Sequence, residues 1–524
     1  MLPNFQKSLQ GLYVRHLIVV GLIIFGLVLR LRQYFAGRSL WLDEAMLALN
    51  IINRNFGELL QPLDYNQGGP VGFLLLEKLT VTLLGNNELT LRFIPLLAGC
   101  AALLLFALLL WRMLGTLGLA LALTLFAAAA PLIYYSSEVK QYSSDVFVTL
   151  FLLWLAAETL GIDQNLNHEG SQSVTKEKNS SFVFLRDKNI FLALAGALAL
   201  WCSHPALFTL TGLGAALLLQ PGIWKDRVRL QAALLVIGTW AVSFVLLYLV
   251  SLRGLAANNF LLDYWGDTFM PLPPWNNWGW FPSMARGLIL FIFSVEGWWL
   301  LAAALMLLGL VTLLRNNLQF GILLALPLFA ALGASALGKY PFAGRMILFA
   351  IPIFITLVAA GVETVVGWLR PRWLAFITGA ALALILFLQT LVSAGENFIR
   401  PKYPEHIRPT MAYLQENRKP DDAIYIYYWA VPAFRYYAPL YGFSENDFVA
   451  GNDYATNPPG LLTEADQFKG RKRVWVLFSH VYEKGTYNEK DALLAHLNDM
   501  GTKKREFRVP GTSVNLYLYD LAGD

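Results

Sequence analysis

Residues 93–111 read FIPLLAGCAALLLFALLLW, and no charged side chain interrupts this stretch. A helix needs roughly 20 mostly apolar residues to cross the hydrocarbon core of a bilayer, so this stretch predicts a transmembrane helix. The rest of the chain follows the same pattern. Of its 524 residues, 56% are hydrophobic and only 14% are charged, whereas soluble domains carry about 25% charged residues. The sequence predicts an integral membrane protein.

About eleven segments are apolar and long enough to span a bilayer, which predicts an all-α polytopic membrane protein. The predicted spans are residues 17–35, 91–112, 116–133, 143–161, 189–203, 205–220, 229–252, 286–314, 318–337, 346–368 and 374–394. Residues 189–220 are too long for one upright span, and Pro205 at their middle breaks a helix, so we count two helices there. The shorter run 71–84 contains Glu77 and Lys78 and predicts an interfacial helix.

Lysine and arginine accumulate in the cytoplasmic loops of membrane proteins, which orients the chain. With the spans above, the following positions fall on one side: Lys7, Arg15, residues 176–188, Lys225, Arg227, Arg229, Arg315, Arg370 and Arg372. We expect a transmembrane domain at 1–395, whose first loop at 36–90 is extracytoplasmic, and an extracytoplasmic domain at 396–524. The expected location is the inner (plasma) membrane of a cell.

The composition changes to that of a soluble domain from Glu396 onward, where 16 basic and 17 acidic residues nearly balance. This part of the chain contains a helix candidate at 404–416 and strand candidates at 423–428, 473–479 and 513–519. The pattern predicts a small soluble α/β domain. The loop at 163–188 is polar and rich in Asn, Ser and Lys, so we expect it to be flexible.

Charge and cysteine content exclude several functions. The formal net charge is +5 and the basic residues form no dense cluster, so we expect no nucleic-acid partner. Cys100 and Cys202 each lie inside an apolar run, which predicts neither a disulfide framework nor a thiolate metal site. Histidines and cysteines do not form a ligand pattern, so we commit to no cofactor and leave a divalent metal open.

Two adjacent carboxylates follow the first span, in the segment Leu40-Trp41-Leu42-Asp43-Glu44-Ala45. A carboxylate in a site of low dielectric constant can gain the basicity that a general base needs. The structural alternative is that Asp43 is the N-cap of a helix over 44–53. The two roles are compatible, and Asp43 and Glu44 are the candidate catalytic residues.

Other outer segments supply candidate substrate-binding residues. Glu138, Lys140 and Tyr142 lead into the fourth span, where charges are costly unless they form an ion pair or serve a ligand. His204 lies in an outer turn, where a purely structural histidine is the alternative. Asp263 belongs to a tryptophan-rich outer loop, whose rings could anchor the chain at the interface or stack on sugars.

A tight outer loop between the ninth and tenth spans contains Lys339, Tyr340 and Arg345. Fixed cations at the membrane surface suit a lipid phosphate, which arginine can bind through two parallel hydrogen bonds. The alternative is that both cations reach toward the lipid headgroups without a specific ligand. We include all three residues among the candidate substrate-binding positions.

Taken together, these segments resemble the GT-C class of membrane glycosyltransferases, in particular bacterial relatives of protein O-mannosyltransferases and of the lipid A aminoarabinose transferase. The most specific part of the resemblance is Leu40–Ala45, and Gly69–Phe73 and Leu84–Phe93 follow it. The segment Glu138–Tyr142 and the Arg345 loop are similar to later motifs of the class.

The resemblance implies a GT-C fold and a hexosyl or pentosyl transferase that inverts the anomeric carbon. The implied partners are membrane lipid, a polyprenyl-phosphate-linked sugar as donor, and a lipid, glycan or protein acceptor on the extracytoplasmic side. Asp43 would deprotonate or orient the acceptor, Lys140 and Arg345 would stabilise the departing phosphate, and Glu44 and Glu138 would help to position the site. One departure is Tyr65-Asn66-Gln67-Gly68-Gly69-Pro70, where members of the class often have a charged residue before the proline.

Two other functions fit parts of the pattern. A transporter or flippase for a polyprenyl-linked saccharide would also need many helices and a cation for phosphate. Its ionisable residues should lie near the membrane midplane, often in paired broken helices, whereas here they cluster at one predicted surface. A non-enzymatic assembly protein would tolerate the loss of Asp43. The pattern favours the glycosyltransferase.

Overall fold

The computed structural model describes residues 2–162, 181–256, 258–454, 457–484 and 487–523. Contacts between residues divide the chain into two compact units, which we call the membrane unit and the C-terminal unit. The membrane unit comprises Met1–Phe35, Phe56–Gly85 and Arg92–Arg400, and the C-terminal unit comprises Ala36–Asn55, Asn86–Leu91 and Pro401–Asp524. The first outer segment of the sequence is therefore shared between the two units.

The membrane unit is built from apolar helices, as a multi-pass membrane protein requires. Among the described residues, eight segments are long and apolar enough to cross a membrane. They contain α1 (Leu2–Tyr34), α5 (Phe93–Met113), α8 (Tyr142–Leu160), α11 (Arg227–Leu247), α15 (Trp299–Asn316), α16 (Leu318–Ala336), α17 (Ile351–Trp368) and α18 (Arg372–Ile399). Shorter apolar helices are α6 (Thr116–Ala128), α9 (Ser181–Cys202), α10 (Ala206–Leu218) and α14 (Trp280–Phe293).

Most predicted spans match helices, and the break at Pro205 is confirmed, because α9 ends at Cys202 and α10 begins at Ala206. The prediction of one span over 286–314 is wrong. That region forms α14 and α15, and Ser294 ends α14 in the left-handed conformation with φ of 57°. Residues 116–133 likewise divide into α6 and α7 (Ala130–Tyr135). The run 71–84 forms the helix α3 (Val71–Leu84).

The polar loop predicted at 163–188 is only partly described. Residues 163–180 lie outside the described residues, and the prediction is wrong for the remainder, because α9 already begins at Ser181. The helix therefore starts about two turns before the apolar run at 189. A helix can extend beyond hydrocarbon, so hydropathy alone places its end too late.

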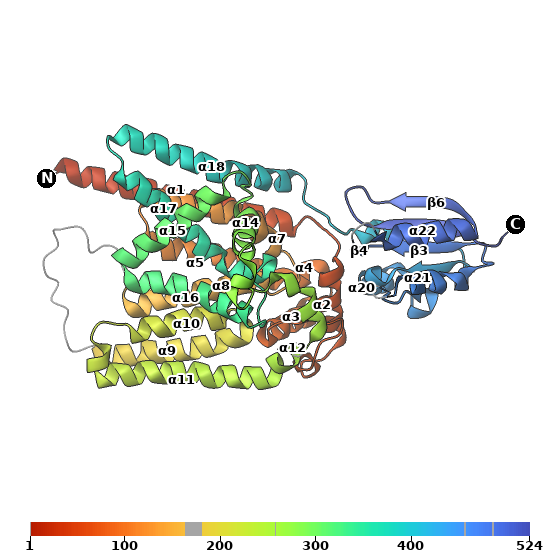
Figure 1. The fold of residues 1–524 in the computed structure, drawn as a ribbon, viewed down its shortest axis with the longest axis horizontal. Helices are drawn as coiled ribbons and strands as arrows, with labels where there is room; N and C mark the ends of the chain where they lie inside the picture. The colour runs from red at the N-terminus through yellow and green to blue at the C-terminus, as the bar shows by residue number, and fades with distance from the viewer. Residues whose placement is uncertain (1, 163–180, 257, 455–456, 485–486, 524) are drawn as a thin grey trace. The chain divides into compact units, whose positions relative to one another are not determined.

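Helices pack closely where small residues face one another, which is how helices associate in a membrane. Gly309 on α15 lies so close to α17 that a Cβ atom there would be 1.9 Å from the Leu357 carbonyl oxygen. Gly361 on α17 is equally close to α15, since its Cβ would be 2.0 Å from the Leu305 carbonyl oxygen. Helices α9, α10 and α11 form a second group of neighbours and run side by side (Figure 1).

Burial shows which helices are central in the membrane unit. In the most apolar window of the α17 segment 89% of residues are buried, compared with 17% in the α18 window. Large apolar side chains on α18 are exposed, including Phe376 and Leu384. Lipid is the solvent for this part of the chain, so an exposed apolar surface is what a peripheral transmembrane helix requires.

The C-terminal unit contains a five-stranded mixed sheet of order β2-β1-β3-β7-β6. Its strands are β1 (Ala423–Ile426), β2 (Val449–Ala450), β3 (Val474–Phe478), β6 (Thr502–Arg508) and β7 (Asn515–Asp520), and β4 (Glu483–Lys484) pairs with β5 (Tyr487–Asn488) apart from them. Strands β1 and β3 are parallel, with Tyr425 opposite Val476, and β3 and β7 are antiparallel, with Val476 opposite Tyr517. The three predicted strands and the predicted α/β class are confirmed.

The helices of the C-terminal unit come from three parts of the chain. They are α2 (Leu42–Asn53), α4 (Glu88–Leu91), α19 (Ile407–Asn417), α20 (Val431–Tyr437), α21 (Pro458–Ala465) and α22 (Glu489–Met500). Every residue of β3 is buried, as expected for the middle strand of a covered sheet. Helix α2 packs against α20, so the segment with the candidate carboxylates belongs to this unit's core.

Candidate active site

Asp43 and Glu44 lie in the first turn of α2. The helix begins at Leu42 and its N-cap residue is Trp41, so the alternative that Asp43 is the N-cap is wrong. Glu44 is the third helical residue, and its Oε2 accepts a hydrogen bond of 3.4 Å from the Trp41 backbone N–H. Negative charge at these positions is stabilised by the unpaired N–H groups at the start of a helix.

The two carboxylates differ in exposure. Glu44 is fully buried, and its Oε1 forms an ion pair of 3.4 Å with Arg38, which is 1% exposed. A buried charge requires such a partner, so the Glu44 carboxylate has a structural role in the ion pair with Arg38. Asp43 is half-buried. Of the pair, Asp43 is the carboxylate that a ligand could reach.

The N-terminus of α2 receives its cap from a distant residue. Trp41 has no side-chain acceptor, and the Leu42 N–H donates instead to Glu405 Oε2 over 3.0 Å. Glu405 is 4% exposed, and it also accepts from Ser479 Oγ at 3.2 Å and contacts His480 Nδ1 at 2.7 Å. Its carboxylate therefore takes the place of the Ser, Thr or Asp that usually caps a helix locally.

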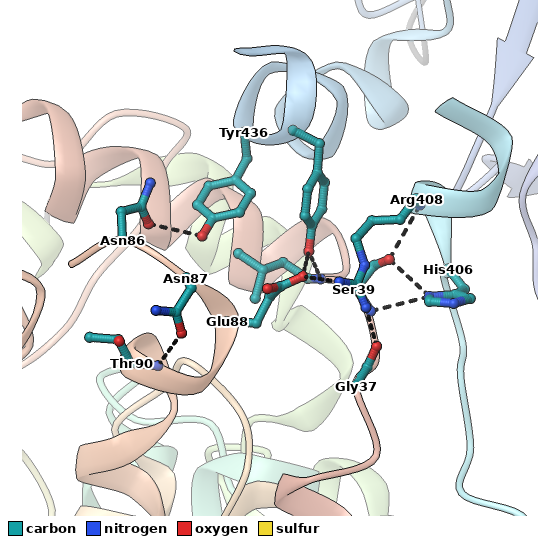
Figure 2. Close-up of polar contacts among 11 residues, drawn as sticks. Gly37, Ser39, Asn86, Asn87, Glu88, Thr90, His406, Arg408 and Tyr436 are labelled. Atoms are coloured by element: carbon teal, nitrogen blue, oxygen red, sulfur yellow. Dashed lines mark hydrogen bonds and ion pairs between the residues drawn. The ribbon is translucent and has the colours of Figure 1, made fainter. Parts of the chain in front are cut away.

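A second group of contacts joins the segments on both sides of α2 to the C-terminal sequence (Figure 2). Tyr437 Oη accepts from the Leu40 N–H at 2.8 Å and donates to Glu88 Oε1 at 3.0 Å. Arg408 forms an ion pair of 3.1 Å with the same Glu88 oxygen, and its guanidinium also donates to the Gly37 carbonyl. Hydrogen bonds that share partners in this way fix a chain in one arrangement.

His406 adds a contact to Ser39, just before the carboxylates (Figure 2). Its Nδ1 accepts from the Ser39 backbone N–H at 3.3 Å and lies 2.9 Å from Ser39 Oγ. The N–H donor means that Nδ1 carries no proton, so we assign the neutral tautomer with hydrogen on Nε2. Burial, and then the charge of Arg408, lower the pKa of His406, while Glu88 acts in the opposite direction.

A cleft of about 660 Å³ opens beside the Glu405 cap, and Glu405, His480 and Asn515 are among its lining residues. The His480 ring is near two indoles, with centroid distances of 6.2 Å to Trp41 and 6.1 Å to Trp429. The cleft is therefore lined by polar groups, and one of them is the Glu405 carboxylate that caps α2.

The membrane unit contains the predicted cations. Lys140 is 4% exposed, and its Nζ donates to Gln67 Oε1 over 2.5 Å. Gln67 belongs to the segment that departs from the pattern of the GT-C class. Arg345 lies over two rings, with its Cζ 5.6 Å from the Tyr142 centroid and 5.8 Å from the Trp265 centroid. Aromatic faces hold a guanidinium in place without neutralising its charge.

Several other predicted residues lie close to these cations. Tyr135 interacts electrostatically with both Glu138, which is fully buried, and Arg345. Tyr340 donates a hydrogen bond of 2.5 Å to the Met346 carbonyl, next to Arg345 in the chain. The structure thus places Glu138, Tyr142 and Arg345 near one another, and Tyr340 bonds to the residue that follows Arg345.

Three predicted residues lie apart from this group or outside its contacts. His204 stands between α9 and α10, and its Nε2 is buried without a hydrogen-bond partner among the described residues. Asp263 on α13 (Asn259–Tyr264) and Lys339 are exposed. The described residues contain no group of three or more His, Cys, Asp and Glu side chains arranged to hold a metal ion.

Residues in both units were not predicted from the sequence. Asp145 in α8 is 4% exposed and interacts electrostatically with Tyr340. Its signal was available, because a carboxylate inside an apolar run is rarely without function. Glu405 and Tyr437 gave no local signal, since their contacts join residues more than 300 positions apart.

Comparison with known proteins places the chain in a fold class. No protein-family model matches the sequence, and no curated protein matches it. The fold is similar to that of ArnT from Cupriavidus metallidurans bound to undecaprenyl phosphate, with 13% identity, a TM-score of 0.53, and coverage of 96% of this chain and 97% of that one. It is also similar to the Archaeoglobus fulgidus oligosaccharyltransferase in complex with Zn and sulfate, with 14% identity, a TM-score of 0.53, and coverage of 88% and 67%.

Both of these proteins are glycosyltransferases of the GT-C class. The similarity extends over most of the chain, although sequence identity is low. The chain therefore has the GT-C fold that the resemblance of its motifs predicted, together with the predicted C-terminal α/β domain.

Proposed function

We propose that this protein is an inverting glycosyltransferase that moves a sugar from a polyprenyl-phosphate donor to a lipid, glycan or protein acceptor. The observation that carries the proposal is the contrast at the start of α2, where Asp43 is half-buried beside the fully buried and paired Glu44. The GT-C fold supports it, and so does the undecaprenyl phosphate bound to ArnT, which shares that fold.

In the proposed reaction, Asp43 is the general base. An acceptor hydroxyl attacks the anomeric carbon of the donor while the Asp43 carboxylate takes the hydroxyl proton. The bond between the anomeric carbon and the phosphate oxygen breaks, and its electron pair leaves with the polyprenyl phosphate. Attack from the side opposite the leaving group inverts the configuration of the sugar.

Lys140 and Arg345 are the proposed cations for the phosphate. Charge accumulates on the leaving phosphate in the transition state, and fixed cations at a membrane-embedded site stabilise it strongly. The hydrogen bond that Lys140 Nζ donates to Gln67 Oε1 holds the ammonium without adding a negative charge that would compete with phosphate. We propose that this neutral amide stands in the place where the class often has a charged residue, and that Glu138 helps to orient the aromatic group around Arg345.

The charged loops bear on the orientation of the chain in the membrane. The distribution of Lys and Arg between loops supports an orientation with the first outer segment and residues 396–524 on the extracytoplasmic side. A multi-pass chain with this orientation would belong to the inner (plasma) membrane and would meet donor lipid on its outer face. Transfer from a panel of polyprenyl-phosphate sugars distinguishes a hexose donor from a pentose donor.

The test is transfer of radiolabel from a panel of polyprenyl-phosphate sugars to a native membrane extract by the purified full-length protein. We expect transfer by the wild type and loss of transfer in Asp43→Asn. The matched control is Asp499→Asn, an identical change at an exposed position of α22 in the same unit. Movement of labelled lipid across a reconstituted bilayer by both the wild type and Asp43→Asn, without donor consumption, would instead establish a flippase.

A further inference from the structure

The C-terminal sequence contacts the backbone at the first residue of α2 and two residues before it. Glu405 accepts from the Leu42 N–H at 3.0 Å, and Tyr437 Oη accepts from the Leu40 N–H at 2.8 Å. These donors lie one and three positions before Asp43. Backbone contacts so close to Asp43 determine the position of its carboxylate. Contacts further along the helix mainly determine whether α2 packs in the unit at all.

Glu405 is itself held by the end of the central strand. Ser479 and His480 follow β3 directly, and their side chains contact Glu405 at 3.2 Å from Ser479 Oγ and 2.7 Å from His480 Nδ1. Each Glu405 oxygen therefore has a defined partner, and the carboxylate cannot rotate freely. A continuous path of hydrogen bonds leads from the sheet through Glu405 to the first turn of α2.

The Tyr437 hydroxyl is also held by hydrogen bonding and by an ion pair on its acceptor. Its hydroxyl donates to Glu88 at 3.0 Å, and Arg408 contacts the same oxygen of Glu88 at 3.1 Å. Tyr437 is fully buried and lies at the end of α20, which packs on α2. Its hydroxyl is thus a fixed acceptor for the Leu40 N–H.

We propose that Glu405 and Tyr437 are positioning residues, through which the C-terminal sequence sets the place of the Asp43 carboxylate for catalysis. The inference rests on the proposed function and assigns a role in it to residues 401–524. Neither residue touches the reacting atoms; both act through the backbone at Leu40 and Leu42. A displacement of about 1 Å in a catalytic group can reduce a rate by about 100-fold, so small losses of position should have large kinetic effects.

The kinetic test compares single-atom and whole-side-chain changes in the full-length protein. Tyr437→Phe removes one hydroxyl, and we expect it to lower kcat about 10- to 100-fold while KM for donor changes less than about threefold. Glu405→Ala should have a similar effect, and Glu405→Gln should recover part of kcat because its amide oxygen can still accept from Leu42. Controls are Tyr413→Phe and Glu416→Ala, both on α19 of the same unit.

A structural readout separates positioning from simple folding. Hydrogen exchange of the backbone amides at 40–45 should accelerate at least about tenfold in Tyr437→Phe and Glu405→Ala, while exchange in the β3 strand and the melting temperature of Tyr437→Phe stay near the wild type. Wild-type kcat in a folded Tyr437→Phe variant would overturn the proposal. So would unchanged exchange at 40–45, or a loss of kcat that Glu405→Gln shares in full with Glu405→Ala.

The two readouts also separate this inference from the proposed function. If the wild type transfers no sugar from any donor, the proposed function is wrong. The exchange experiment would still show whether Glu405 and Tyr437 hold the backbone at 40–45. If transfer occurs and depends on Asp43 but tolerates both positioning variants, the function stands and this inference fails.

Discussion

Two neighbouring carboxylates at the start of α2 are surrounded very differently, and their variants should therefore fail in different ways. Asp43→Asn removes the proposed base from a half-buried position, so we expect transfer to fall by about 100- to 10,000-fold with little change in stability. Glu44→Gln removes the negative charge of the buried ion pair with Arg38, which should lower the free energy of unfolding by about 3 kcal/mol. Thermal unfolding and the transfer assay, run on both variants, measure the two effects separately.

Similar unfolding temperatures for Glu44→Gln and the wild type would show that the buried pair with Arg38 is not needed for folding. Full transfer activity in Asp43→Asn would remove Asp43 as the base. Local sequence was sufficient to select these two residues as candidates, because adjacent carboxylates after a transmembrane span are a visible signal. It was not sufficient to separate their roles, since burial and the ion pair with Arg38 depend on the folded chain.

His406 should make the C-terminal unit sensitive to acid. Burial and the Arg408 charge lower the pKa of His406 below its ordinary value of 6.5. Between these two pKa values the unfolded chain binds more protons than the folded chain, so stability rises with pH and is lost as pH falls below about 6.5. Protonation would also place a hydrogen on Nδ1, opposite the Ser39 N–H.

The corresponding measurement is the urea midpoint of the wild type and of His406→Gln between pH 8 and pH 5. We expect the wild type to lose more stability than the variant over this range, because only the wild type has the imidazole that must be protonated. Parallel pH curves for the two proteins would show that His406 is not the group responsible.

At the scale of elements, the close contact of α15 and α17 depends on glycine. Gly309→Ala would put a methyl group into the space that the Leu357 carbonyl oxygen occupies, 1.9 Å away, and one helix would have to move. We expect thermal unfolding in detergent to show a loss of about 1–3 kcal/mol, the range for overpacked interiors. Gly333→Ala on α16 is the matched control, because nothing lies within 4 Å of a Cβ atom there. Equal melting temperatures for the two variants would contradict the packing argument.

Elements were predictable wherever one local property determines them. Apolar runs predicted most of the transmembrane helices, since a bilayer accepts few other structures. The division of 286–314 was missed because Ser294 to Trp298 contains only one charged residue, Glu296, in a long apolar stretch. Strand β6 was missed because its sequence, TKKREFR, is that of an exposed edge and lacks the alternation of a half-buried strand.

At the scale of the whole molecule, the C-terminal unit is the part that sequence reasoning could not assemble. It combines Ala36–Asn55 and Asn86–Leu91 with Pro401–Asp524, across hundreds of intervening residues. The predicted motifs at Leu40–Ala45 and Leu84–Phe93 were visible as separate sequences. Their common partners, Tyr437 and Arg408, have no signature, because a tyrosine or an arginine in a soluble domain has many ordinary uses.

This composition of the C-terminal unit predicts that the chain can be divided at Arg400 and still assemble. Residues 1–400, produced with an affinity tag, and residues 401–524, exported separately, should copurify, because Ala36–Asn55 supplies α2 to the core of the unit. Buried apolar residues on both pieces, such as Leu47 and Phe434, would otherwise be exposed to water.

Copurification and transfer activity of the two pieces measure this assembly. We expect transfer activity when both pieces are present and none with 1–400 alone, since α2 then lacks the Glu405 cap and the Tyr437 contact. The control is a tail with Glu416→Ala, which should bind equally well because that side chain is exposed. A tail that folds in isolation but does not bind the tagged piece would show that 36–55 and 86–91 are not integral to the unit. Activity of 1–400 alone would show that Asp43 holds its catalytic position without the C-terminal sequence.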